Sequence, residues 1–474
     1  MGNRCIMGIA SEKCRISPNA LAQEIQNRID EYPGIILGEH TNIHHKIKLP
    51  YTYRNRHMYM IGRSGSGKTN TIRQMIMQDI ENGYGVATIA PEAEMLTEEI
   101  LPYISDERID DVVYFNPADM EYPIPINPLH LDADEDIDQC VDDLITIFMR
   151  LSDDISPRMR EIMYHAFYGL MERKGSTLLD VEILLDKTDP SLRDEIIATT
   201  ENPRTARFFE KVFPTLPRDA TIPVYTRIGQ LVSPKRVRNL LCQPGKSFNF
   251  RQAMDDGRIL LFNLSDGILG EQTSQLLGQL VVTKIQQAVF SRADTSKHQR
   301  RPFYLYLDEF QAFVGDNQSS YEKILSRSRK YNFGVCLANQ ATSQIPDDLL
   351  QGILGNVSTL LVFEVASRDA EKFSKELIFD FGNVVEELPS YELLRLRVGQ
   401  AWGKIGKTVF PLTTPLADQK PDMGRAKEVI ERSRLNYGIS SGKPPRRPET
   451  PERPFLEIPD IDDDDAIDHS RVFE

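Results

Sequence analysis

The chain has 474 residues, 40% of them apolar and 27% charged, which are the proportions of an ordinary globular protein. Its longest apolar runs fall well short of the roughly 18 residues needed to cross a bilayer, and its amino-terminal residues lack the apolar core of a signal peptide. The five cysteines are an odd number without C-x-x-C spacing, which argues against a disulfide framework or a zinc site. We therefore expect a cytoplasmic protein with a large core and no membrane contact.

The net charge of −14 would ordinarily count against a nucleic-acid partner, because phosphate contacts need lysine and arginine. The charge is unevenly distributed, however. Residues 449–474 alone carry −8, which leaves only −6 for the rest of the chain. That mild value leaves room for a local basic surface, so net charge does not exclude DNA.

The first predicted elements, in chain order, are two short apolar runs that can pair as a hairpin, 34–38 and 46–49. From His57 the pattern changes to strand, glycine-rich turn, helix and strand, which is typical of parallel α/β architecture. The expected elements of this part are the strand 57–61, the helix 68–82 and the strands 86–90 and 112–115.

Between about 137 and 253 the apolar residues recur with the period of helices, and Ser156 and Pro157 fit the N-cap and first turn of one of them. The α/β pattern then resumes. The expected elements are the strand 258–264, the helix 270–292, the strand 303–307, a helix near 321–331, the strands 333–338 and 359–365, and a late pair, 400–404 and 408–412, that closes the sheet. The proline-containing and acidic stretch 440–468 predicts a disordered tail.

Residues 62–69 read Gly-Arg-Ser-Gly-Ser-Gly-Lys-Thr and match the phosphate-binding motif G-x-x-x-x-G-K-[ST] between an expected strand and helix. Backbone N–H groups of such a loop wrap the phosphates, Lys68 reaches the β- and γ-phosphates, and the Thr69 hydroxyl completes the Mg²⁺ shell. ATP and Mg²⁺ are therefore the expected cofactors. The predicted nucleotide-binding residues are Gly62, Ser64, Gly65, Ser66, Gly67, Lys68 and Thr69.

The apolar strand 303–307 ends in two carboxylates, Asp308 and Glu309, as a Walker B element does. We expect Asp308 to hold Mg²⁺ together with Thr69, and Glu309 to polarise the attacking water as a general base. The pair indicates hydrolysis rather than phosphoryl transfer to a metabolite, which disfavours a small-molecule kinase.

Two further positions fit roles in hydrolysis. Gln340 ends the next core strand, where a polar side chain can sense the γ-phosphate. Upstream of it, Arg327 and Arg329 place cations at one end of a helix, from which an arginine finger can reach a neighbouring subunit's γ-phosphate. We favour Arg329 as the finger, although the sequence leaves Arg327 open. Glu309, Lys68, Gln340 and Arg329 are thus the predicted catalytic residues.

Together these elements predict an α/β protein with the RecA-like, additional-strand P-loop NTPase fold, a mostly parallel central sheet and an inserted all-α subdomain. The expected units are an amino-terminal extension with a short hairpin (1–53), a first core part with the phosphate loop (54–134), a helical insert (135–255), a second core part (256–438) and an acidic tail (439–474).

In its motifs the chain resembles the HerA/FtsK superfamily, and within it the HerA-like and conjugative coupling-type DNA-pumping ATPases. The resemblance runs from about 34 to 437 and rests on ordered blocks at 57–69, 110–117, 127–129, 303–310, 329–340 and 356–370. It implies a homohexameric ring, ATP bound between subunits and duplex DNA in a central channel. It also implies that Gln340 is the sensor, that Arg329 acts in trans, and that the helical insert corresponds to the all-α domain of coupling proteins.

Several positions depart from the family pattern. After the second strand the family commonly has Asp-Pro-His/Lys-Gly-Asp/Glu, whereas this chain has Ala-Pro-Glu-Ala-Glu at 90–94, so the acid has moved to Glu92 or Glu94. Glu364 stands where a basic residue is frequent. The 61 residues before Gly62 are too few for the β-barrel of HerA, and we expect the motor core alone.

Two functions remain in view. The first is an ATP-hydrolysing hexameric DNA translocase or helicase-like motor, working with a partner nuclease or other effector since no nuclease constellation is recognisable in the sequence. The second is an ATP-gated ring scaffold of an antiphage defence complex, for which the acidic tail is a plausible docking segment. The histidines at 40, 44, 45 and 57 lack acidic or cysteine partners at ligand spacing, so a metal cluster there is disfavoured.

Overall fold

The computed structural model describes residues 33–42, 44–90, 92–132, 135–149, 156–314, 318–380, 385–415 and 421–439. The predicted acidic tail and most of the predicted amino-terminal extension lie outside these ranges. The division of the chain into five units therefore stays a prediction, and the described elements are given by their own bounds.

The centre of the molecule is a sheet in which seven parallel strands follow the order β9-β3-β8-β7-β4-β6-β5. Strand β8 lies between β3, which leads into the phosphate loop, and β7, which ends in the Walker carboxylates. This is the arrangement that an additional-strand fold requires. The strands are β3 (Met58–Ile61), β4 (Gly85–Ala90), β5 (Val112–Phe115), β6 (Ile259–Asn263), β7 (Phe303–Leu307), β8 (Phe333–Asn339) and β9 (Thr359–Val362).

Four antiparallel strands extend the sheet beyond β9 in the order β12-β13-β1-β2. They are β12 (Gln400–Ile405), β13 (Thr408–Thr413), β1 (Gly34–His40) and β2 (Lys46–Pro50), and the short strands β10 (Ile378–Asp380) and β11 (Val385–Glu387) pair separately. The prediction that the late pair closes the sheet was wrong. The outer edge of β13 pairs with β1, so β2 forms the edge strand.

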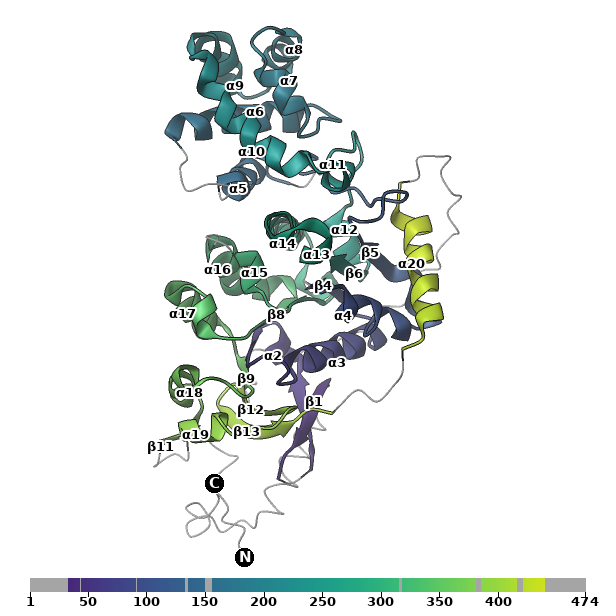
Figure 1. Cartoon of the computed structure of the whole chain (residues 1–474), viewed down its shortest axis with the longest axis vertical. Coiled ribbons are helices and arrows are strands. Elements are labelled where there is room, and N and C mark those ends of the chain that lie inside the picture. The colour runs from purple at the N-terminus through teal and green to yellow at the C-terminus, as the bar shows by residue number, and fades with distance from the viewer. Residues whose placement is uncertain are drawn as a thin grey trace, which may run out of the picture.

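The sheet separates two hydrophobic cores because successive side chains of a strand point to opposite faces. In β3, Tyr59 and Ile61 belong to one core, and Met58 and Met60 belong to the other. Figure 1 shows α14, α16 and α17 on one side of the sheet and α3 and α20 on the other. These helices and their shorter neighbours are α2 (Tyr51–Arg54), α3 (Lys68–Glu81), α4 (Ala93–Thr97), α13 (Asp266–Leu269), α14 (Glu271–Ser291), α15 (Gln311–Val314), α16 (Gln318–Arg327), α17 (Asp347–Asn356), α18 (Ser367–Ser374), α19 (Ser390–Leu393) and α20 (Met423–Tyr437).

Eight α-helices lie between β5 and β6 in the described part of the chain, and most of them gather at one end of the molecule in Figure 1. Their apolar residues continue the core that covers the α14 face of the sheet. Ser156 caps α6 as expected, since its hydroxyl accepts a hydrogen bond from the Met159 N–H at 3.2 Å. The helices are α5 (Ile137–Met149), α6 (Pro157–Glu172), α7 (Asp180–Leu185), α8 (Ser191–Thr199), α9 (Pro203–Arg207), α10 (Ile222–Val232), α11 (Lys235–Leu241) and α12 (Phe250–Asp255).

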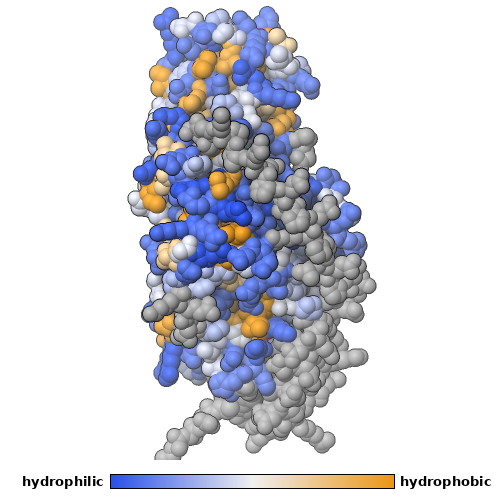
Figure 2. Space-filling view, turned by 90° about the vertical axis from the view of Figure 1, so that its right-hand side faces the viewer, coloured by the Kyte–Doolittle hydropathy of each residue, from blue (hydrophilic) through white to orange (hydrophobic). Residues whose placement is uncertain are grey.

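The surface seen in Figure 2 is mostly hydrophilic, with small separate hydrophobic patches. None of the helices in the described ranges combines the length and the apolar character that a membrane span requires.

Candidate nucleotide-binding site

The phosphate loop joins β3 to α3 at the carboxyl edge of the parallel strands. Its glycines are needed for two physical reasons. Gly65 and Gly67 adopt positive φ angles of 73° and 115°, which side-chain-bearing residues rarely tolerate. Gly62 is packed so closely that a Cβ atom there would lie 2.5 Å from the Cβ of Phe363. The sequence therefore folds into a narrow turn whose backbone faces the start of α3.

Lys68 begins α3 and is 4% exposed. Its ammonium donates to the carbonyl oxygens of Gly62 at 2.6 Å and Arg63 at 3.2 Å, and so lies within the curve of the loop. Burial lowers the pKa of Lys68, while the carboxylates of Glu309 and Asp308 oppose that shift. A cation held in this place has the position needed to contact the β- and γ-phosphates of a nucleotide.

Thr69 and Asp308 meet from two different elements. The Thr69 hydroxyl donates a hydrogen bond of 2.6 Å to Oδ2 of Asp308, which directly follows β7 and is 5% exposed. Burial raises the pKa of the Asp308 carboxyl, and the hydrogen bond from Thr69 partly offsets this. A hydroxyl oxygen beside a carboxylate oxygen is the type of donor set that suits Mg²⁺, so the two residues fit the expected metal.

Glu309 stands next to Asp308 with a positive φ of 47°, a left-handed conformation that residues other than glycine adopt only infrequently. Its carboxylate accepts hydrogen bonds from two glutamines, Gln340 at 3.1 Å and Gln311 at 2.7 Å, and its Oε1 lies 3.9 Å from the Lys68 ammonium. The structure thus brings the predicted base and the predicted sensor into direct contact. Gln311 was not predicted as a site residue from the sequence, in which its only signal is its place two residues after Glu309.

The predicted arginine finger lies at the opposite edge of the sheet. Arg327 and Arg329 precede β8, whereas Gln340 follows it, and the seven residues of β8 span roughly 20 Å at about 3.3 Å per residue. Both arginines are exposed. The structure therefore does not bring them to Lys68 of the same chain.

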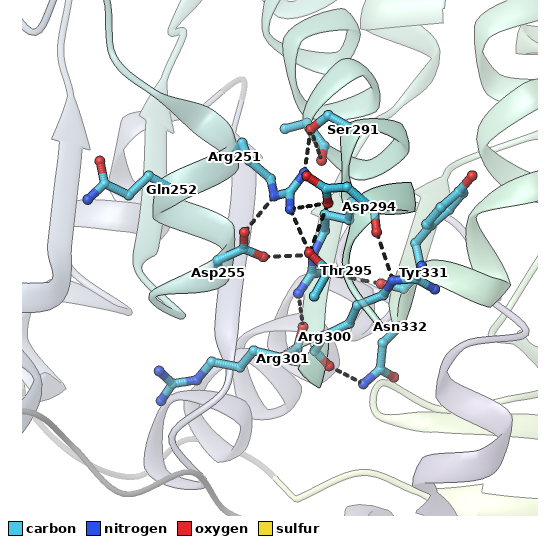
Figure 3. Close-up of polar contacts among 12 residues, drawn as sticks. Arg251, Gln252, Asp255, Ser291, Asp294, Thr295, Arg300, Arg301, Tyr331 and Asn332 are labelled. Atoms are coloured by element: carbon cyan, nitrogen blue, oxygen red, sulfur yellow. Dashed lines mark hydrogen bonds and ion pairs between the residues drawn. The ribbon is translucent and has the colours of Figure 1, made fainter. Parts of the chain in front are cut away.

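The segment that carries Arg329 is held in place by hydrogen bonds from neighbouring side chains. Figure 3 shows the polar side chains that join the ends of α12 and α14 to the starts of β7 and β8. Arg300 donates to the Lys330 carbonyl at 2.6 Å, the buried Arg292 donates to the Tyr331 carbonyl at 3.2 Å, and Asn332 donates to the Arg300 carbonyl at 2.8 Å. These contacts fix the short 3₁₀ turn Ser328–Tyr331, which ends the predicted helix 321–331 earlier than expected.

Residues on the β9 side of the loop also differ from the expected pattern. The predicted strand 359–365 ends at Val362, because the next residues turn onto the phosphate loop. The Arg63 N–H donates to the Glu364 carbonyl at 2.8 Å, and the two side chains form an ion pair at 2.9 Å. Glu364 therefore balances a cation of the loop itself. Glu92 and Glu94 lie exposed at the start of α4, and a role for either stays a prediction.

No group of three or more histidine, cysteine, aspartate or glutamate side chains within the described ranges is arranged to hold a metal ion. His57 is buried among protein partners, with its ring nitrogens 3.0 Å from the Leu325 carbonyl and 3.1 Å from the Val335 N–H.

The sheet order and the loop geometry define a RecA-like P-loop NTPase of the additional-strand type. The family model for the type IV secretion-system coupling protein DNA-binding domain matches residues 41–386. The chain therefore belongs to this family of coupling-type P-loop proteins within the HerA/FtsK superfamily.

Solved structures agree with this fold. The plasmid coupling protein TrwB in complex with the non-hydrolysable GTP analogue GDPNP is similar, with a TM-score of 0.56 and 15% identity over 84% of this chain and 93% of that one. TrwB in complex with ADP and Mg²⁺ has a TM-score of 0.56 and 14% identity, with coverages of 86% and 95%. VirB4 of Thermoanaerobacter pseudethanolicus has a TM-score of 0.55 and 16% identity, with coverages of 81% and 97%. A search of curated proteins gives no match.

Proposed function

We propose that this chain hydrolyses ATP and uses the energy to translocate DNA. The observation that carries the proposal is the convergence of Lys68, Thr69, Asp308, Glu309 and Gln340 at the carboxyl edge of one sheet. Membership of the coupling-protein family supports DNA as the partner, and the nucleotide and Mg²⁺ complexes of TrwB support the same ligands for this chain.

The reaction assigned to the site is attack of a water molecule on the γ-phosphate. Lys68 stabilises the charge on the phosphates, and Glu309 accepts a proton from the attacking water as the P–O bond to ADP breaks. Thr69 and Asp308 would hold Mg²⁺, which would supply further neutralisation of the phosphate charge. The Gln340 amide donates to Glu309, and Gln340 directly follows β8. Loss of the γ-phosphate therefore changes the contact between Glu309 and Gln340 at the end of this strand.

We further propose a homohexameric ring around duplex DNA, because Arg329 lies at the opposite edge of the sheet from Lys68. Only a second copy can place this arginine against the nucleotide. The test mixes Lys68→Ala and Arg329→Ala subunits, each of which should be inactive alone. In random mixed rings about one quarter of the interfaces combine an intact lysine with an intact arginine, and a corresponding fraction of activity should return.

Arg327→Ala is the matched control, since this arginine is exposed on the same segment and should keep most of its activity. If the mixture recovers no activity, and the native chain is a monomer with full ATPase activity, both the ring and the finger are overturned. If Arg327→Ala is inactive and Arg329→Ala is active, the finger is Arg327.

Stimulation of ATP hydrolysis by duplex DNA tests the motor directly. We expect the stimulation to fade as salt rises, because phosphate contacts in a channel release counterions. The alternative is an ATP-gated ring that organises a nuclease or another effector in antiphage defence, and the acidic segment 449–474 favours it as a docking sequence. ATP hydrolysis that duplex DNA leaves unchanged at low salt would favour this scaffold over the motor.

A further inference from the structure

One stretch of this acidic chain is strongly basic. Residues 220–254 contain six lysines and arginines and no aspartate or glutamate, although the whole chain has a net charge of −14. Two of the six are accounted for within the fold, because Arg227 is buried and Arg251 forms ion pairs with two aspartates. The other four side chains are exposed, on α11 and in the segment that follows it, and they are Lys235, Arg236, Arg238 and Lys246.

The charges of these four side chains are not compensated by carboxylates. None of the four forms an ion pair with another residue that the structure describes. The Arg236 guanidinium donates to the Ile268 carbonyl at 3.0 Å, and that of Arg238 donates to two neighbouring backbone carbonyls at 3.3 and 3.4 Å. These bonds orient the guanidinium groups without adding negative charge. Residues 235–246, here called the basic segment, therefore present a local positive surface that attracts a polyanion.

A polyanion of matching character occurs in the same chain, outside the described residues. Residues 460–468, here called the acidic run, contain six aspartates and no lysine or arginine. The acidic run begins 21 residues after Ile439, where the described part of the chain ends, and at about 3.3 Å per residue that length spans up to roughly 70 Å. The connection is therefore long enough for the acidic run to reach the basic segment.

The connection to the acidic run also starts beside the basic segment. The Ile439 N–H donates to the Pro123 carbonyl at 2.9 Å. Two residues further along, the Pro125 carbonyl accepts a hydrogen bond of 2.8 Å from the Phe248 N–H, and Phe248 lies two residues after Lys246. A covalent tether raises the effective concentration of the acidic run at a surface within its reach. This arrangement favours the chain's own acidic run over a separate polyanion.

We propose that the acidic run binds the basic segment of its own chain and thereby shields it from other polyanions, duplex DNA among them. Six carboxylates facing four uncompensated cations supply the attraction. Exposed ion pairs are screened by salt, so the contact is strongest at low ionic strength. The contact itself does not depend on the proposed function, whereas the competition with DNA rests on it.

Cross-linking of the full chain with a carbodiimide tests the contact, because this reagent joins a carboxylate to a lysine amine only when the two groups touch. At low salt, mass spectrometry should find the acidic run linked to Lys235 and Lys246, and high salt should abolish both links. Lys330 is the matched control, an exposed lysine in a second group of cations at 327–330, and should stay unlinked. A mixture of isotopically light and heavy chains separates links within a chain from links between chains. Links to Lys330 alone, links only between chains, or no link to the basic segment would overturn the proposal.

Duplex DNA affinity at low salt tests the shielding. Replacing the four aspartates 462–465 by asparagine in the full chain should tighten DNA binding by roughly threefold to tenfold, the scale of a few exposed ion pairs. Adding Lys235→Gln, Arg236→Gln and Arg238→Gln should remove this gain. The control neutralises four exposed carboxylates elsewhere, with Asp348→Asn, Glu371→Gln, Glu386→Gln and Glu387→Gln, and so changes the net charge equally.

The two sets of four substitutions separate shielding from net charge. Equal tightening by both sets, or a gain that persists without the cations of α11, would overturn the shielding. If no variant binds duplex DNA, the proposed DNA-translocating function fails, and the cross-links still decide whether the acidic run binds the basic segment.

Discussion

Replacing Glu309 by glutamine separates nucleotide binding from hydrolysis. The substitution keeps the size of the side chain, but an amide has one oxygen to offer where the carboxylate accepts from both Gln340 and Gln311. It also removes the group that takes a proton from water. General-base catalysis contributes about 10²- to 10⁴-fold, so we expect kcat to fall by that factor, equivalent to about 3–5 kcal/mol of activation free energy.

The assay is phosphate release at saturating ATP, together with a binding titration on the same protein. Glu309→Gln should bind ATP about as tightly as the native chain, because the phosphate contacts of Lys68 remain. Lys68→Ala should lose binding itself. Glu371→Gln, an exposed carboxylate on α18, controls for the loss of one charge. A Glu309→Gln variant that retains more than about a tenth of the native kcat would refute the assignment of this residue as the base.

Two predictions concern stability. Arg54 is buried with Asp79, donates to the Tyr306 hydroxyl at 2.8 Å and lies 3.9 Å above the Tyr304 ring, so Arg54→Ala should cost about 3–5 kcal/mol in chemical denaturation. Arg160→Ala, from a half-exposed ion pair, should cost less than about 1 kcal/mol, and similar losses for both variants would contradict this reasoning. Burial, with a smaller contribution from Arg329, lowers the pKa of His57 from 6.5 to about 4, so the unfolded chain binds the proton more tightly. The contribution of His57 to the free energy of unfolding is therefore fully present above pH 6.5 and is lost as the pH drops toward 4, by about 2 kcal/mol at pH 5. Chemical denaturation at pH 7 and pH 5 should show a smaller loss of stability for His57→Gln than for the native chain.

Local sequence patterns predicted the central elements of the site well. The predicted strand 57–61, the glycine-rich turn and the predicted helix 68–82 correspond to β3, the loop and α3 within one residue. These elements are contiguous in sequence, and their periodicity and turn chemistry are local properties. The same holds for β7, whose five buried residues end at the acidic pair. The catalytic roles of the residues stay predictions until the variants are measured.

Contacts between distant segments could not be read from the sequence. The pairing of β13 with β1 joins residues more than 370 positions apart, and nothing in either strand specifies its partner. The bond between Gly399 and Ser66 and the ion pair of Glu364 with Arg63 have the same origin. Each depends on where β9 and β12 end in the sheet, which is a property of the assembled fold. The conformation of 328–331 likewise depends on Arg292, which directly follows α14, and on Arg300, which precedes β7.

The placement of Gln340 and Arg329 at the two ends of one strand leads to a last prediction. Strand β8 is buried along its whole length and is paired on both sides, so its ends cannot move independently. In the proposed ring, one end contacts the chain's own nucleotide through Gln340, and the other carries Arg329 to the nucleotide of a neighbour. Occupancy of one site should therefore influence hydrolysis at the next, and the dependence of rate on ATP concentration should be sigmoidal.

Gln340→Ala removes the contact with Glu309 and should reduce the Hill coefficient toward one, even where residual hydrolysis persists. Gln344→Ala, which alters a glutamine in the turn after β8 that bonds only to Ala341 among the described contacts, is the control and should keep the native curve. A Gln340→Ala protein with an unchanged Hill coefficient would show that β8 does not couple the sites.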